Sequence, residues 1–147
     1  MPGAASAAAF ASSTDGNVDI YTIPIDGGNA QRLTTARGID TQPAWAPNGR
    51  QIAFTSTRAG TPQIYLMDAE GLNVRRVSWQ GAYNDSAAWS PSGDRLAYTS
   101  RIDGFFQIVV LDLTTEGQPL AITWFSLGQT MRMALARRMA GDEEGAQ

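Results

Sequence analysis

The stretch that decides the fold runs from Pro43 to Ser56 and reads Pro-Ala-Trp-Ala-Pro-Asn-Gly-Arg-Gln-Ile-Ala-Phe-Thr-Ser. It returns 44 residues later, from Ala87 to Ser100, as Ala-Ala-Trp-Ser-Pro-Ser-Gly-Asp-Arg-Leu-Ala-Tyr-Thr-Ser. The spacing also extends backward, because Phe10 lies 44 residues before Phe54. A fixed period in the low forties is typical of the four-stranded blades of a β-propeller. The sequence therefore predicts an all-β fold made of repeated antiparallel sheets.

The repeat divides residues 1–124 into three units. Units 39–78 and 83–124 each supply four strands separated by Gly-rich and Pro-rich turns. Unit 7–35 supplies three strands and lacks the innermost one. We therefore predict a partial β-propeller of about three four-stranded antiparallel blades. Its first strand falls in an alanine-rich N-terminus, for which a signal peptide is the alternative interpretation.

A different pattern begins after Trp124. Leu127, Met131, Leu135 and Met139 recur every four residues, which indicates an α-helix with one apolar face. Residues 125–147 are therefore predicted to form a C-terminal tail with a short α-helix. Such a helix more often covers its own protein's core than a membrane surface.

Within each blade the repeated residues have structural explanations. Trp45 and Trp89 fall on the predicted innermost strands, where an indole ring would fill the wedge between neighbouring blades. Ile52 and Phe54 alternate with Ala53, so they should face the opposite side of the sheet from Ala53.

The composition excludes several classes of function. The 147 residues contain no cysteine and no histidine, which removes disulfides, thiolate metal sites and Ser-His-Asp catalysis. All eleven basic residues are arginines scattered along the chain, and the net charge is −3, so nucleic acid is not an expected partner. No apolar run is long enough to span a membrane. We expect no cofactor and no enzymatic activity.

The repeated residues resemble the WD40-like repeat of the TolB family of β-propellers. The matching motifs are Trp45 to Gly49, Ile52 to Ser56, Ile64 to Asp68, and Arg76-Val77-Ser78. Asn48 and Ser92 depart from the family's usual aspartate. The resemblance covers residues 7–124. It implies a non-catalytic scaffold for protein–protein interaction, in the periplasm or another extracytoplasmic compartment, although no signal peptide is evident.

In TolB-like proteins a lipoprotein partner of a cell-envelope complex docks at the mouth of the central channel. In this chain the loops expected there carry charged, amide and aromatic side chains, a combination typical of polar protein-binding surfaces. The candidate binding residues are Asp40, Gln42, Arg58, Tyr83, Asn84, Asp85, Arg101 and Asp103. The alternative is that these carboxylates only form turns and the arginines are only solvated.

Other functions stay open at this point. The chain could be the gating propeller of a prolyl-oligopeptidase-type hydrolase, which would need a separate catalytic domain, or a carbohydrate-binding propeller. Asp40, Asp85 and Asp103 could hold a calcium ion, although no Asp-x-Asp-x-Asp loop is present.

Three blades are fewer than the four to eight that close a propeller. An open arc would leave apolar blade faces exposed, which soluble monomers rarely tolerate. We therefore expect a fragment of a longer propeller, or a truncated gene product, whose exposed faces drive self-association. Two copies that pair to complete a ring and a face covered by the C-terminal helix are the alternatives.

Overall fold

The computed structural model describes residues 6–115 and 120–124, and the side chains of residues 6–115. It contains eleven β-strands in this part of the chain. The strands are β1 (Ala7–Ser12), β2 (Asp19–Pro24), β3 (Gln31–Arg32), β4 (Asp40–Trp45), β5 (Gln51–Ser56), β6 (Gln63–Asp68), β7 (Arg75–Arg76), β8 (Tyr83–Trp89), β9 (Arg95–Ile102), β10 (Phe105–Asp112) and β11 (Leu120–Trp124).

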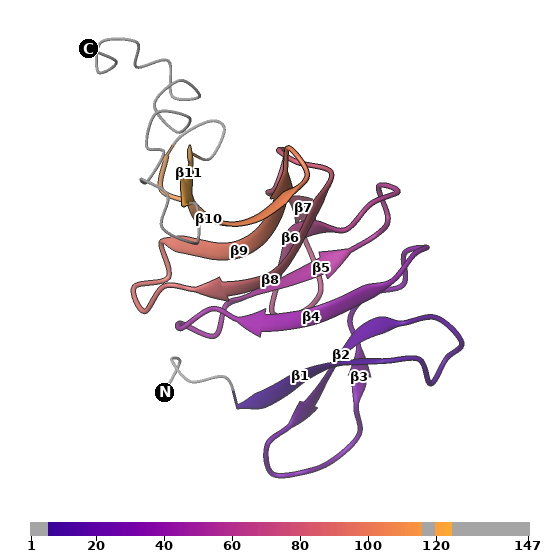
Figure 1. Cartoon of the computed structure of the whole chain (residues 1–147). Helices are drawn as coiled ribbons and strands as arrows, with labels where there is room; N and C mark the ends of the chain where they lie inside the picture. Colours follow the sequence, from indigo (N-terminus) through magenta and orange to yellow (C-terminus); the bar gives the residue numbers. More distant parts are fainter. Residues whose placement is uncertain (1–5, 116–119, 125–147) are drawn as a thin grey trace, which may run out of the picture.

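The strands form three antiparallel sheets that follow one another along the chain and lie side by side (Figure 1). The first sheet has the order β1-β2-β3, the second β4-β5-β6-β7 and the third β8-β9-β10-β11. Each later sheet adds an inner strand, β4 or β8, that the first sheet lacks. The predicted fold class, a partial propeller of about three blades with an incomplete first one, is confirmed. The predicted helix near residues 127–139 lies outside the described residues.

The two inner strands share an irregularity that the repeat did not reveal. The pairing of β4 with β5 shifts between Thr41 and Ala44, and the pairing of β8 with β9 shifts between Asp85 and Ala88. Inside each bulge one residue has a positive φ, 53° at Gln42 and 59° at Ser86. A bulge bends its strand and increases the local twist. Each inner strand therefore bends at the same point of the repeat.

The connection between β9 and β10 is shorter than the corresponding connection between β5 and β6. β9 continues to Ile102 and β10 begins at Phe105, whereas β5 ends at Ser56 and β6 begins at Gln63. Asp103 and Gly104 form the two-residue turn, both with positive φ, 51° and 82°. This is the geometry of tight β-hairpins, for which Asp-Gly is a favoured pair. The third sheet therefore extends beyond the second one at this end.

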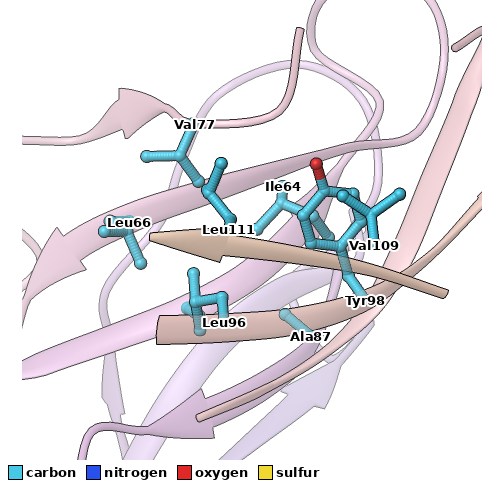
Figure 2. Close-up of a cluster of buried hydrophobic side chains, with 9 residues drawn as sticks. Ile64, Leu66, Val77, Ala87, Leu96, Tyr98, Val109 and Leu111 are labelled. Atoms are coloured by element: carbon cyan, nitrogen blue, oxygen red, sulfur yellow. The ribbon is translucent and has the colours of Figure 1, made fainter. Parts of the chain in front are cut away.

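Two apolar clusters hold the sheets together. One lies between the second and third sheets and contains Ala53, Ile64, Leu66, Val77, Ala87, Leu96, Tyr98, Val109 and Leu111. Figure 2 shows Leu66 and Val77 of the second sheet gathered with Leu96 and Leu111 of the third. The other lies between the first and second sheets and contains Ile20, Ile52, Phe54, Tyr65 and Met67.

The two clusters confirm the alternation expected from the sequence. Ile52 and Phe54 pack toward the first sheet, whereas Ala53 packs toward the third. Strand β5 is buried on both faces because its sheet lies between the other two. Burial of one such side chain contributes roughly 1.5–3 kcal/mol, so these clusters supply the main stabilisation of the stacked sheets.

Both repeated tryptophans lie between sheets, as predicted. Trp45 packs against the cluster between the first and second sheets, and Trp89 packs against the cluster between the second and third. The Trp89 indole also donates a hydrogen bond of 2.9 Å to the carbonyl oxygen of Ala44 in β4. An indole ring on an inner strand therefore bonds to the inner strand of the preceding sheet.

The alanine-rich N-terminal stretch forms β1, which pairs with β2 from Ala7↔Pro24 to Ser12↔Asp19. Phe10 stacks on Tyr21 with ring centroids 5.7 Å apart, and Phe54 stacks on Tyr65 at 5.8 Å. The same aromatic pair is thus repeated 44 residues later. Among the described residues no helix could cross a membrane.

Candidate protein-binding rim

The strand register places the predicted binding residues at one end of the sheets. In the second sheet Asp40 pairs with Ser56, and Ser56 pairs with Gln63, so β4 and β6 begin where β5 ends. In the third sheet Tyr83 pairs with Arg101 at the corresponding end. We call this end of the sheets the rim.

Asp40 and Arg58 form an ion pair at the rim of the second sheet. Their Oδ2 and guanidinium nitrogen are 3.0 Å apart, and the Asp40 side chain is fully buried while that of Arg58 is 22% exposed. The Arg58 guanidinium also lies over the rings of Phe54 and Tyr65, at 5.4 and 4.9 Å from their centroids. Ser56 Oγ accepts a further hydrogen bond from Arg58 Nε. Arg58 thus neutralises a buried carboxylate and is held in place by its own sheet.

Asn84 is also fully buried and contributes to the contact between two sheets. Its Nδ2 donates hydrogen bonds of 2.7 Å to Gln63 Oε1 and to the carbonyl oxygen of Gln80. The same Gln63 oxygen accepts the hydroxyl of Ser78 at 2.8 Å. Sequence reasoning did not identify this network, because Gln63 and Ser78 lie inside predicted strands. Asp40 and Asn84 are therefore buried below the surface of the rim, where they bind neighbouring side chains, and neither offers an exposed polar group.

Gln42 connects the two bulged inner strands. Its Oε1 accepts hydrogen bonds from the backbone N–H of Ser86 at 3.0 Å and from Thr55 Oγ1 at 2.8 Å. Its Nε2 donates to Ser86 Oγ at 3.1 Å. The side chain is exposed, so it is accessible from solvent while it fixes the bulge of β8.

The third sheet gathers the largest group of accessible rim residues. The Tyr83 hydroxyl donates to Asp85 Oδ2 at 2.8 Å, and this hydrogen bond raises the pKa of the Tyr83 phenol above its ordinary value. The ring of Tyr83 meets Phe106 edge to face at 6.0 Å. The Arg101 guanidinium lies 6.0 Å from the centroid of the same Phe106 ring. We call these four residues the aromatic cluster.

Three exposed aromatic residues of the rim were missed by the sequence analysis. Phe105 is 72% exposed, Phe106 59% and Trp79 58%. Phe105 and Phe106 follow the Asp103-Gly104 turn, and Trp79 lies in the connection from β7 to β8, where Arg76 covers its ring at 4.4 Å. Large rings directly beside a turn signal could have identified them, because such positions are rarely buried.

The structure brings some predicted residues together and separates others. Arg58 contacts Asp40, and Tyr83 contacts Asp85, while Arg101 joins the latter pair through Phe106. Asp103 lies exposed in the adjoining turn. Among the described residues no group of three acidic side chains could hold a metal ion, so the calcium alternative that joined Asp40, Asp85 and Asp103 is wrong.

Three consecutive antiparallel sheets, in which the inner strands β4 and β8 pack against the preceding sheet, define a partial β-propeller. Residues 2–127 match the family model described as PD40, the TolB beta propeller domain. The chain therefore belongs to this family, as the resemblance in its sequence indicated.

Individual relatives agree with this assignment. The Tol-Pal system protein TolB of Geobacter sulfurreducens is 48% identical over 44 residues, which cover 30% of this chain and 10% of that protein. The crystal structure of TolB from Acinetobacter baumannii superimposes with a TM-score of 0.71 and 31% identity, covering 85% of this chain and 31% of that chain. This chain thus spans less than a third of the solved TolB.

The fold is shared more widely. Dipeptidyl peptidase 4 of Porphyromonas gingivalis matches with a TM-score of 0.65 and 21% identity, covering 92% of this chain and 18% of that one. At this level of identity the likeness concerns the propeller fold alone.

Proposed function

We propose that this chain is a non-catalytic propeller scaffold that binds a protein partner through the rim. The observation that carries the proposal is the aromatic cluster of Tyr83, Asp85, Arg101 and Phe106, which is accessible on one end of the third sheet. Tyrosine and arginine are enriched among residues that dominate binding energy at protein interfaces. Their arrangement here is held by contacts within the sheet, so binding costs little conformational entropy.

The buried pairs beneath the rim support the same function. Arg58 with Asp40, and Asn84 with Gln63, fix the ends of neighbouring strands without presenting reactive groups. A rigid surface of this kind suits recognition and not a chemical step. The absence of histidine and cysteine from the sequence also removes the commonest catalytic bases and nucleophiles.

Membership of the TolB family points to the class of partner. The relative from Geobacter sulfurreducens is named as a protein of the Tol-Pal system. We propose that the partner is the lipoprotein of such a cell-envelope complex, and that the chain acts in the periplasm. Asp103 and Gln42, both exposed near the cluster, would then contribute polar contacts around the aromatic centre.

The test is a binding measurement with the purified soluble domain of the Tol-Pal lipoprotein from Geobacter sulfurreducens. Replacing Arg101 and Phe106 by alanine should weaken binding at least tenfold, because both lie in the accessible cluster. The matched control replaces Arg95 and Leu72. Arg95 is exposed at the other end of β9, and Leu72 is 63% exposed in the turn between β6 and β7, away from the rim.

Equal affinity for both double variants would remove the rim from the binding site. Binding that is absent even for the unchanged chain would remove the lipoprotein as the partner. A change confined to the Arg101 and Phe106 variant supports both parts of the proposal.

Self-association is the second part of the proposed function. The outward face of β10 exposes Ile108, which is 47% accessible, whereas Ile64, its counterpart 44 residues earlier, is fully buried against the next sheet. We propose that a second copy covers this face, because an exposed blade face is an apolar surface that soluble proteins rarely leave open.

A further inference from the structure

Strand β8 directs its side chains to different sides of the third sheet before and after Ser86. Tyr83 and Asp85 lie before Ser86 and belong to the accessible aromatic cluster. Ala87 and Trp89 lie after it and pack in or against the apolar cluster between the second and third sheets (Figure 2 shows Ala87 there). In a regular strand, alternate residues such as these would all lie on one side of the sheet. The strand therefore changes sides at Ser86.

The register of β8 against β9 gives the same result. Asp85 pairs with Thr99 and Ala88 pairs with Ala97, so three steps along β8 match two steps along β9. Residues that pair directly across two strands lie on the same side of the sheet. The bulge thus contains one extra residue, and a shift of one residue moves every following side chain to the other side.

The bulge depends on a backbone conformation that serine rarely adopts. Ser86 has a φ of 59°, in the left-handed region that favours glycine. A residue of another type keeps such a conformation only where its surroundings hold it there. Ser86 is exposed, so the packing of its side chain does not hold it. The hydrogen bonds to Ser86 are therefore the contacts that maintain the bulge.

Gln42 of the second sheet supplies these hydrogen bonds. Its Oε1 accepts the backbone N–H of Ser86 at 3.0 Å, and its Nε2 donates to Ser86 Oγ at 3.1 Å. Thr55 Oγ1 donates to the same Oε1 at 2.8 Å, and Thr55 is only 3% exposed. A buried hydroxyl thus orients the carboxamide, and the carboxamide fixes the point at which the next inner strand changes sides.

We propose that Gln42 is a positioning residue for the aromatic cluster: by holding the bulge at Ser86, it keeps Tyr83 and Asp85 on the accessible side of the third sheet. The Gln42 carboxamide oxygen already accepts two hydrogen bonds, so its effect on a partner is transmitted through Ser86. The inference rests on the proposed function only for its effect on partner binding.

The first experiment needs no partner. An NMR titration of the full chain measures the pKa of the Tyr83 phenol, which the hydrogen bond to Asp85 raises above its ordinary 10.0. Gln42→Met keeps the length of the side chain but removes its hydrogen-bonding groups, so the pKa of Tyr83 should fall back toward 10.0. Gln31→Met, the same change at an exposed residue of β3, should leave this pKa unchanged. An unchanged Tyr83 pKa in Gln42→Met would overturn the proposal.

A second substitution separates positioning from direct contact with the partner. Glycine adopts a positive φ without steric cost, so Ser86→Gly should keep the bulge without the help of Gln42. Gln42→Met should weaken binding of the soluble lipoprotein domain about three- to tenfold, and the double variant Gln42→Met/Ser86→Gly should bind within about twofold of the unchanged chain. Ser86→Gly alone should bind as the unchanged chain does.

The outcomes distinguish this inference from the proposed function. A double variant that binds as weakly as Gln42→Met would show that Gln42 contacts the partner directly, which would overturn the positioning role. If the unchanged chain does not bind the lipoprotein domain but the Tyr83 pKa responds as expected, the partner is wrong and the positioning role stands. Weakened binding with an unchanged Tyr83 pKa would exclude the positioning role and leave the proposed function intact.

Discussion

Arg58 shows how a single residue can have a structural role inside a predicted binding surface. The sequence placed it on the rim as a candidate contact, and the structure adds that it neutralises the fully buried carboxylate of Asp40. An isolated charge in the interior would be unfavourable without such a partner. At the residue scale, therefore, the rim contains both supporting and accessible side chains.

This distinction predicts different effects for two arginines. Arg58→Ala should lower the free energy of unfolding by about 2–3 kcal/mol, because it leaves Asp40 buried without its ion pair. Arg101→Ala should change it by less than about 0.5 kcal/mol, since Arg101 is exposed. Urea denaturation of the three proteins measures both values. Similar losses for the two variants would show that the Arg58 ion pair is not a main source of stability.

The two inner-strand tryptophans allow a second comparison. Trp89→Phe should destabilise the chain by about 1–2 kcal/mol, because it removes the hydrogen bond to the carbonyl oxygen of Ala44 as well as some packing. Trp45→Phe loses similar packing but no hydrogen bond within the described part of the chain, so its loss should be smaller. Thermal unfolding of both variants would contradict this prediction if their losses were equal.

At the scale of the element, the turn from Ser90 to Arg95 depends on the ionisation of Asp94. The hydroxyls of Ser92 and Ser90 donate to its Oδ1 at 2.5 and 2.9 Å, and they lower the pKa of this carboxyl below its ordinary 3.8. Ser90 Oγ also accepts the backbone N–H of Arg95 at 3.1 Å. The ionised form is thus favoured by the folded turn.

The pH dependence follows from the lowered pKa. The contribution of Asp94 is present above about pH 4 and is lost as the pH falls through the lower pKa of the folded state. The melting temperatures of the unchanged chain and Asp94→Ala should therefore differ at about pH 6, and the difference should shrink as the pH falls below 3.8. A difference that stays constant over this range would contradict the assignment.

Turns at the rim differ in how tightly they are packed. Gly81 has a φ of +73°, and a Cβ there would lie 2.7 Å from the carbonyl oxygen of Arg101. Gly104 has a φ of +82°, but a Cβ there would meet nothing within 4 Å. Both positions disfavour an L side chain, and Gly81 adds a steric conflict with the backbone.

We therefore expect Gly81→Ala to cost about 2–4 kcal/mol and Gly104→Ala about 1 kcal/mol in the free energy of unfolding. The pair separates backbone strain from steric conflict, since φ is similar at the two glycines. Chemical denaturation measures both, and equal costs would indicate that the connection from β7 to β8 shifts without penalty.

At the scale of the whole molecule, the three sheets form an arc whose last face is not covered by a further described sheet (Figure 1). The repeat makes the effect clear, because Ile64 is fully buried between sheets while Ile108 is 47% exposed. The same residue type at the same repeat position thus has a different environment at the end of the arc.

Self-association should depend on Ile108. Light scattering of the chain should reveal a dimer or a larger species, and Ile108→Ser should shift it toward monomer because it reduces the apolar area of the face. Arg95→Ser is the control, as it changes an exposed residue of the neighbouring strand at the opposite end from the rim. A monomeric unchanged chain, or an unchanged dimer in Ile108→Ser, would contradict the proposed interface.

The sequence by itself determined the period of 44 residues, the three sheets and the two faces of each strand. These features are local, since alternation and turn residues act within a few positions and the repeat applies them three times. It also named eight candidate rim residues, of which six are at least partly accessible in the structure. It did not show that Asp40 and Asn84 are buried, because their exposure depends on the neighbouring sheet.

Only the tertiary structure decided which side chains meet. Phe106 contacts both Tyr83 and Arg101, which brings side chains of β8, β9 and β10 together. Trp89 of the third sheet donates a hydrogen bond to Ala44 of the second. These pairs depend on strand register and on the bulges at Gln42 and Ser86. A repeat in the sequence specifies each sheet, but the contacts between sheets follow from how their side chains pack in three dimensions.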